Sequence, residues 1–127
     1  MVGAAAVHDI TSVDANTAAS LKSLRGGQVD LYTKLVALFR TGSTDALARL
    51  REALGASDLK AAASICHKLA ASAGNVGALG YAKQVRALEH LCAAGDASHT
   101  AEILQSLQAA HAPLMSALTD HTLRATA

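Results

Sequence analysis

The sequence predicts an all-α fold, an up-down antiparallel four-helix bundle with a short additional N-terminal helix. Hydrophobic residues make up 51% of the 127 residues, whereas aromatic residues make up 2%, and the chain has one proline. Alanine and leucine supply most of the apolar residues and cost least in a helix, while the residues that favour strands are scarce. Short connections between long amphipathic segments favour antiparallel neighbours, which makes a bundle the expected architecture.

A chain of this length is expected to form one hydrophobic core. We therefore expect a single domain over residues 1–127, with its core over about residues 14–124. The sequence leaves open whether residues 1–13 are ordered. No internal repeat or long linker divides the chain.

The first two helices are separated by a pair of glycines. Residues 14–24 predict a short helix that Asp14 caps, and residues 25–27 end it. From residue 29 to residue 54 apolar side chains recur mostly at helical spacing, which predicts one long helix. Gly42 is a weak point of this helix, and two helices in series are the alternative.

The next helix begins after a clear break. Gly55 ends the long helix and Ser57 or Asp58 caps its successor, which runs to about Gly74. A turn over residues 74–77 follows it.

The last two helices follow this turn. One occupies about residues 78–94 and ends where Gly95 can adopt the left-handed conformation. The final helix contains Pro113, which we expect to kink it or to restart it.

Composition and charge exclude several classes of function. With 11 basic and 10 acidic residues the formal charge is +1, so nothing favours binding to nucleic acid or to an anionic membrane. No apolar run is long enough to span a bilayer, and the first residues lack the basic leader of a signal peptide. Cys66 and Cys92 lie among apolar neighbours and are interpreted as reduced core residues, which fits a cytoplasmic protein.

His67 is the residue on which a functional interpretation centres. A helix turns by about 100° per residue, so Ala62, Ile65 and Leu69 lie on the face opposite His67, which therefore points outward. Lys60 shares the exposed line of His67. The other residues near that line are no larger than serine: Ala63, Ser64, Ala71 and Gly74.

An exposed histidine can bind a metal, serve a hydrolase, accept a phosphoryl group or have no chemical role. No HxxxH or CxxC spacing indicates a metal site, and no serine or cysteine motif indicates a hydrolase. A surface histidine without a role is the general expectation. An exposed imidazole on a low surface also suits transfer of a phosphoryl group from a partner's aspartyl phosphate, with Lys68 and Lys60 as stabilising cations. The other histidines are scattered over different elements: His8, His90, His99, His111 and His121.

The run HKLAASAGNVGA followed by YAKQVRALE resembles the histidine-containing phosphotransfer (HPt) domain of multistep two-component phosphorelays. The resemblance covers about residues 29–110. In it His67 matches the phosphorylated histidine, and the other matched positions are Leu69, Ser72, Gly77, Ala78, Leu88 and Glu89.

The resemblance implies a carrier in signal transduction rather than an enzyme with turnover. Nε2 of His67 would take a phosphoryl group from the phosphoaspartate of a response-regulator receiver domain and pass it to another receiver. A sensor or hybrid histidine kinase is the other expected partner, and the alanine content is weakly associated with bacterial sequences. The chain would need no cofactor or metal of its own, because the Mg²⁺ is expected on the receiver. The expected partner-binding residues are Lys60, Ala63, Ser64, Ala70, Ala71, Gly74 and Lys83.

Two positions depart from the family pattern. Ala70 stands where the family has a lysine, and Ala71 stands where it has a glycine. Lys68 is the possible replacement for the missing cation. The departures also motivate the alternative function, a non-phosphorylated helical adaptor that binds a receiver or a kinase.

Overall fold

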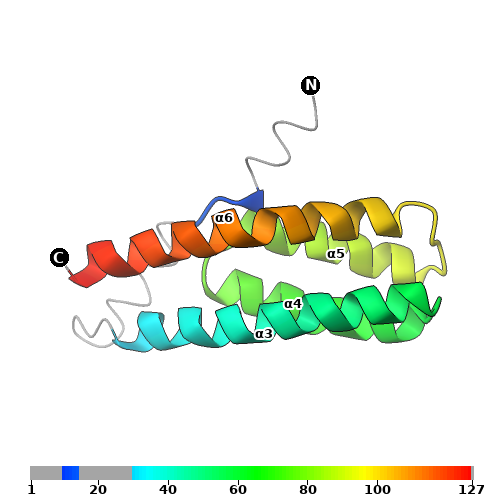
Figure 1. Cartoon of the computed structure of the whole chain (residues 1–127), viewed down its shortest axis with the longest axis horizontal. Helices are drawn as coiled ribbons and strands as arrows, with labels where there is room; N and C mark the ends of the chain where they lie inside the picture. Colours follow the sequence, from blue (N-terminus) through cyan, green and yellow to red (C-terminus); the bar gives the residue numbers. More distant parts are fainter. Residues whose placement is uncertain (1–9, 15–29, 127) are drawn as a thin grey trace, which may run out of the picture.

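The structure of the protein is a computed structural model that describes residues 10–14 and 30–126. The described residues form four helices and no strand (Figure 1). The helices are α3 (Asp30–Gly55), α4 (Leu59–Asn75), α5 (Leu79–Ala93) and α6 (Thr100–Thr126). The all-α prediction is confirmed, whereas the short helix expected over residues 14–24 falls, beyond Asp14, outside the described residues.

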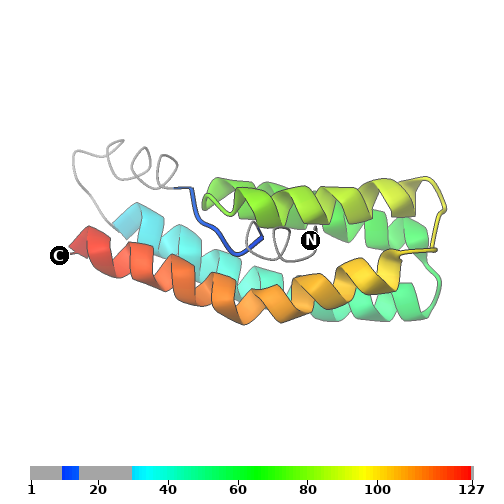
Figure 2. The ribbon, with the colours of Figure 1, turned by 90° about the horizontal axis from the view of Figure 1, so that it is seen from above.

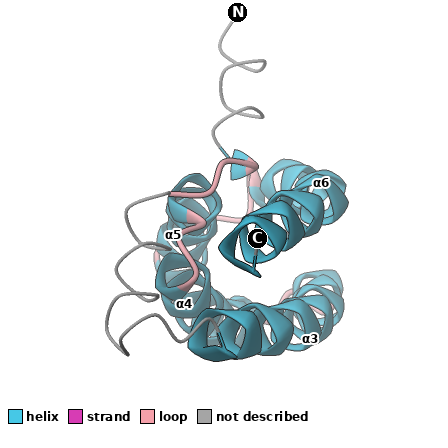
Figure 3. Cartoon of the chain, turned by 90° about the vertical axis from the view of Figure 1, so that its left-hand side faces the viewer, coloured by secondary structure: helices cyan, strands magenta, loops and turns pink. Residues whose placement is uncertain are grey.

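The four helices close into a bundle. Helices α3 and α5 each pack against both α4 and α6. Figure 3, which looks along the helices, shows them around a common centre, and Figure 1 shows successive helices running in opposite directions. The predicted up-down antiparallel arrangement is therefore present.

A few large side chains link the helices within a core of mostly alanine and leucine. Tyr32 and Tyr81 are fully buried, and their hydroxyl groups donate to the carbonyls of Val76 (3.3 Å) and Leu107 (3.5 Å). The rings of Phe39 and Tyr81 meet edge-on, with centroids 6.3 Å apart. These contacts connect all four helices, because Val76 caps the end of α4.

The segment before the bundle contributes to the core. Ile10 is 2% exposed and Val13 packs against the buried cluster. The amide of Asp14 donates to the carbonyl of Gly77, at 2.7 Å, in the turn between α4 and α5. The core therefore begins a few residues before the expected boundary at residue 14.

Two helices continue through a residue that weakens helical structure. Helix α3 is unbroken at Gly42, which confirms the single long helix, and buried Phe39 and Leu47 hold it on either side. Helix α6 runs through Pro113, so the restart, one of the two expected outcomes, does not occur. Pro113 is exposed, and Figure 2 shows α6 bending along its length, as expected where a proline removes one backbone hydrogen bond.

The turns follow the predicted chemistry. A carboxylate oxygen of Asp58 accepts from the amide of Ala61 at 3.1 Å, so Asp58 is the cap of α4. Gly77 and Gly95 have φ of 86° and 73°, a region that favours glycine. In the turn before α4 the positive φ, 56°, falls on Ser57.

Two further expectations from the sequence concern the cysteines and membrane-spanning segments. Cys66 and Cys92 are both free and buried, as predicted. Within residues 10–14 and 30–126, none of the helices has the length and apolar character needed to cross a membrane.

Candidate functional site

His67 lies near the middle of α4 on its exposed face. Its side chain is 68% exposed, whereas Cys66 and Leu69 on the opposite side of the helix are buried. The outward direction predicted from helix geometry is confirmed.

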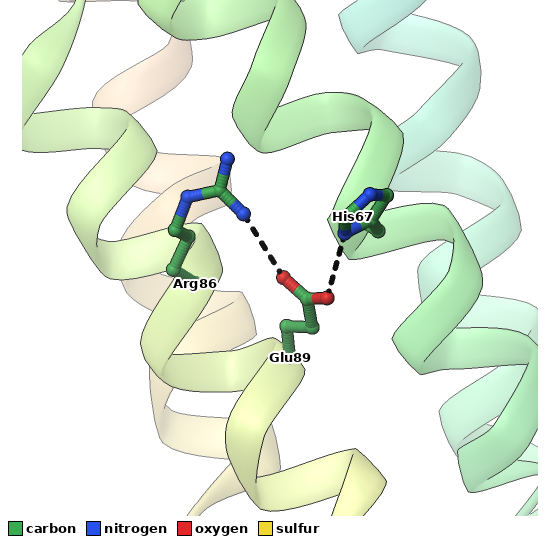
Figure 4. A network of polar contacts seen from close by, with 3 residues as sticks. All are labelled: His67, Arg86 and Glu89. Atoms are coloured by element: carbon green, nitrogen blue, oxygen red, sulfur yellow. Dashed lines mark hydrogen bonds and ion pairs between the residues drawn. The ribbon is translucent and has the colours of Figure 1, made fainter.

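A hydrogen bond joins His67 to the neighbouring helix. His67 Nδ1 lies 2.9 Å from Oε2 of Glu89 on α5 (Figure 4). The other carboxylate oxygen, Oε1, lies 3.4 Å from an Nη atom of Arg86, one turn earlier on α5. The side chain of Glu89 is only 19% exposed, so the carboxylate is largely enclosed between two basic groups.

The hydrogen bond to Glu89 determines which ring nitrogen can react. An ionised carboxylate can only accept hydrogen bonds, so Nδ1 carries the hydrogen. The neutral imidazole then has its lone pair on Nε2. Figure 4 shows this second nitrogen on the side of the ring away from Glu89. His67 therefore presents a nucleophilic nitrogen to the exterior of the bundle.

The other histidines with described contacts lack this arrangement. Nε2 of His111 lies 2.7 Å from the hydroxyl of Ser43, in the interface between α3 and α6, so that nitrogen is occupied. Burial, with the charge of Arg40, lowers the pKa of His111. Nδ1 of His99 is 3.6 Å from Glu102, beyond hydrogen-bonding distance.

Most of the predicted partner-binding residues lie on the surface. Three on α4 and one on α5 are exposed: Lys60, Ser64, Ala71 and Lys83. Lys68, the expected phosphate stabiliser, is also exposed. Ala63 and Gly74 are half-buried, and no atom outside the local backbone lies within 4 Å of the position that a side chain at Gly74 would take. Small side chains therefore lie exposed or half-buried on the face of α4 that carries His67.

Ala70 is the exception, and its expected place on the exposed surface is wrong. Its side chain is 1% exposed. Ala70 lies about 60° around the helix from His67, on the flank that α5 covers. A larger side chain there would disturb the contact between α4 and α5 instead of blocking a partner.

A groove between α3 and α4 borders the site on the other flank. It has a volume of about 440 Å³, and its lining includes Leu38, Ile65, Lys68 and Ser72. Leu38 is 69% exposed. The groove was not predicted from the sequence, although Leu38 lies outside the buried spacing of α3.

The contact between Glu89 and His67 was also not predicted from the sequence, in which Glu89 only matched a position of the family pattern. The sequence does contain an indication of this contact. His67 and Glu89 are equally far in sequence from Ala78, the residue that precedes α5. Two antiparallel helices joined by a short turn bring such positions to the same level.

Other reactive groups near His67 are either inert or scattered. Burial, followed by the charges of Cys92 and Glu89, raises the pKa of the Cys66 thiol to about 12, so it is protonated at neutral pH. In the part of the chain that the structure describes, no three potential metal ligands gather.

Comparison with known proteins gives a family match. The model of a family described as the Hpt domain matches residues 34–120, which is more than half of the chain. No curated protein and no solved structure matches the chain. The matched range includes the whole network of His67, Glu89 and Arg86.

Proposed function

Because the chain belongs to the Hpt domain family, whose members transfer phosphoryl groups in two-component phosphorelays, we propose that His67 is its phosphorylated residue. The observation that carries the proposal is the hydrogen bond from Nδ1 to Glu89, which leaves Nε2 free on an exposed ring. The proposed donor is the phosphoaspartate of a receiver domain, and the acceptor is the aspartate of another receiver.

The proposed transfer uses the two ring nitrogens differently. The Nε2 lone pair attacks phosphorus, and the N–P bond forms as the bond to the aspartate oxygen breaks. The aspartate leaves as a carboxylate. Nδ1 keeps its hydrogen, and the positive charge that the ring gains faces the Glu89 carboxylate. The same steps in reverse pass the phosphoryl group to the second receiver.

Lys68 and Lys60 are the proposed cations beside the phosphoryl group. Lys68 lines the groove that α4 forms with α3, so it lies on the flank away from Glu89. Lys60 is exposed two turns before His67 on the same line of α4. A point charge on a flexible side chain can reach an incoming phosphoryl oxygen from either place.

In this proposal the receiver domain supplies the active-site loops and the metal ion. The small residues around His67 would let the loops of a receiver approach Nε2, and the Mg²⁺ would be held by that receiver. A sensor or hybrid histidine kinase would supply phosphoryl groups to such a relay, and the cytoplasm is the proposed location.

Labelling tests the proposal. The protein is mixed with receiver domains that acetyl phosphate has phosphorylated, and the label on the chain is measured after acid and after alkali. We expect acid-labile, alkali-stable label on the wild type, because a phosphoramidate has that stability. The substitution His67→Gln should abolish the label, whereas His99→Gln should not change it.

The adaptor hypothesis predicts a different outcome of the same experiment. A non-phosphorylated adaptor would bind a receiver or a kinase and carry no label. Binding without label on the wild type, for a panel of receivers, would therefore contradict the proposal. Label that persists in His67→Gln would contradict the choice of residue.

A further inference from the structure

The carboxylate of Glu89 lies between two basic side chains. Arg86 Nη1 is 3.4 Å from Oε1, and His67 Nδ1 is 2.9 Å from Oε2. Figure 4 shows the three groups in a row, with the carboxylate in the centre. Each carboxylate oxygen thus has one basic partner.

We propose that Arg86 is a positioning residue for phosphotransfer, because it holds the Glu89 carboxylate in the orientation that keeps the hydrogen on Nδ1 of His67. This inference rests on the proposed function and extends it to a residue that does not touch the phosphoryl group. Removal of Arg86 should therefore change the tautomer of His67, while every group on the Nε2 side of the ring stays in place.

Arg86 and the proposed phosphoryl group lie on opposite sides of the His67 ring. Nδ1 faces Glu89 and α5, so Nε2 lies on the far side of the imidazole (Figure 4). Arg86 belongs to α5 and reaches the ring only through the carboxylate. Lys68, in contrast, lies on the flank of α4 that faces α3. The two cations therefore act at opposite nitrogens.

Packing between α4 and α5 explains why Arg86 can take this position. The helices are antiparallel, so three residues forward from His67 on α4 correspond to three residues back from Glu89 on α5. Ala70 and Arg86 are consequently at the same level. Ala70 is a buried alanine, so at this level of α4 its side chain offers only a methyl group and does not compete with the guanidinium for the carboxylate.

A partly enclosed carboxylate gains more from such a cation than an exposed one. Glu89 is 19% exposed, so it has lost much of its hydration, whereas Arg86 is 47% exposed and reaches it from the surface. The exposed Lys83, one turn before Arg86, has no hydrogen bond or ion pair among the described contacts. Lys83→Gln is therefore a matched control for the tautomer measurement, because it removes a cation from the same helix.

The test compares three variants with the wild type. Arg86→Gln removes the charge, Arg86→Lys keeps it, and Lys83→Gln is the control. Nitrogen NMR of the histidine ring reports the tautomer of His67 and needs no partner protein. The rate of phosphoryl transfer is measured with a receiver domain phosphorylated by acetyl phosphate, and thermal unfolding checks that each variant is folded.

The proposal predicts a joint change in tautomer and rate. Arg86→Gln should lower the ratio of the Nδ1–H to the Nε2–H tautomer about two- to fivefold, which is the range that partly exposed ion pairs support. The transfer rate should fall by a similar factor, and Arg86→Lys should restore both. Lys83→Gln, at a position expected to bind the partner, should leave the tautomer ratio unchanged.

Two results would overturn the role of Arg86. One is an unchanged tautomer ratio in Arg86→Gln, even if transfer is slower, because Arg86 would then act on docking or on the phosphoryl group. The other is an equal change of the tautomer ratio in Lys83→Gln. Failure of the wild type to accept phosphoryl would instead reject the proposed function, and the NMR ratio would still decide whether Arg86 controls the tautomer.

Discussion

At the scale of single residues, the bond between His67 and Glu89 matters more for chemistry than for stability. A pair this exposed contributes roughly 0.2–1 kcal/mol, whereas a domain has a stability of about 5–15 kcal/mol. The same energy changes the ratio of two tautomers up to about fivefold. Losing Glu89 should therefore leave the fold intact and change the reactive nitrogen.

Cys66, the residue before His67, allows a prediction of reactivity. Burial raises the pKa of its thiol to about 12, so the reactive thiolate appears only as the pH approaches that value. At pH 8 we expect iodoacetamide to modify Cys66 in the folded protein at least about a hundredfold more slowly than in the denatured chain. Mass spectrometry of timed samples measures the rates. Equal rates would contradict the core-facing position of Cys66, and with it the outward direction of His67.

At the scale of the helices, small side chains decide how the site is built. Ala62, Ala70 and Ala73 are buried on α4, and α5 packs closely against them. This close approach lets a glutamate on one helix reach a histidine on the other. On the exposed side, Ala71 and Gly74 keep the surface around the ring low.

The exposed small residues predict where a bulky substitution blocks docking. Ala71→Trp places a large side chain one turn from His67 at an exposed position. We expect transfer from a phosphorylated receiver to slow about tenfold or more, because a loss of about 1.4 kcal/mol in docking is enough for that factor. Stability should change by less than about 0.5 kcal/mol, as for most surface changes.

Ala109→Trp is the matched control for Ala71→Trp. Ala109 is equally an exposed helix alanine, but it lies on α6 and not on the helix that carries His67. Transfer in this variant should equal that of the wild type. A similar loss in both variants, or none in either, would show that the receiver does not dock on the α4 surface.

At the scale of the whole molecule, the sequence predicted the features that depend on one helix at a time. Helical spacing located the helix that became Leu79–Ala93 to within a residue or two, and the 100° turn placed His67 outside. Features that need two helices were missed. Helical spacing within α4 does not show which flank α5 covers, so Ala70 was expected among the partner-binding residues although it is buried. The contact of Glu89 depends on the level of α5 along α4.

The groove beside α3 belongs to the same class of missed features. Its lining comes from α3 and from α4, and neither segment alone indicates a hollow. Pro113 shows the opposite situation. The sequence predicted that this proline would kink or restart the helix, but α6 continues through it because the helix is packed in the bundle. Tertiary packing overrides a local preference whenever buried residues on both sides of the weak point stay in the core.

The measurement that tests the central claim most directly is NMR of the phosphorylated protein with nitrogen-labelled histidine. Packing of α5 against α4 places Glu89 beside Nδ1 of His67 and leaves Nε2 facing the exterior. We predict that phosphorus couples to Nε2 of His67 and that Nδ1 keeps its hydrogen. Phosphorus on Nδ1, or on another histidine, would contradict the account.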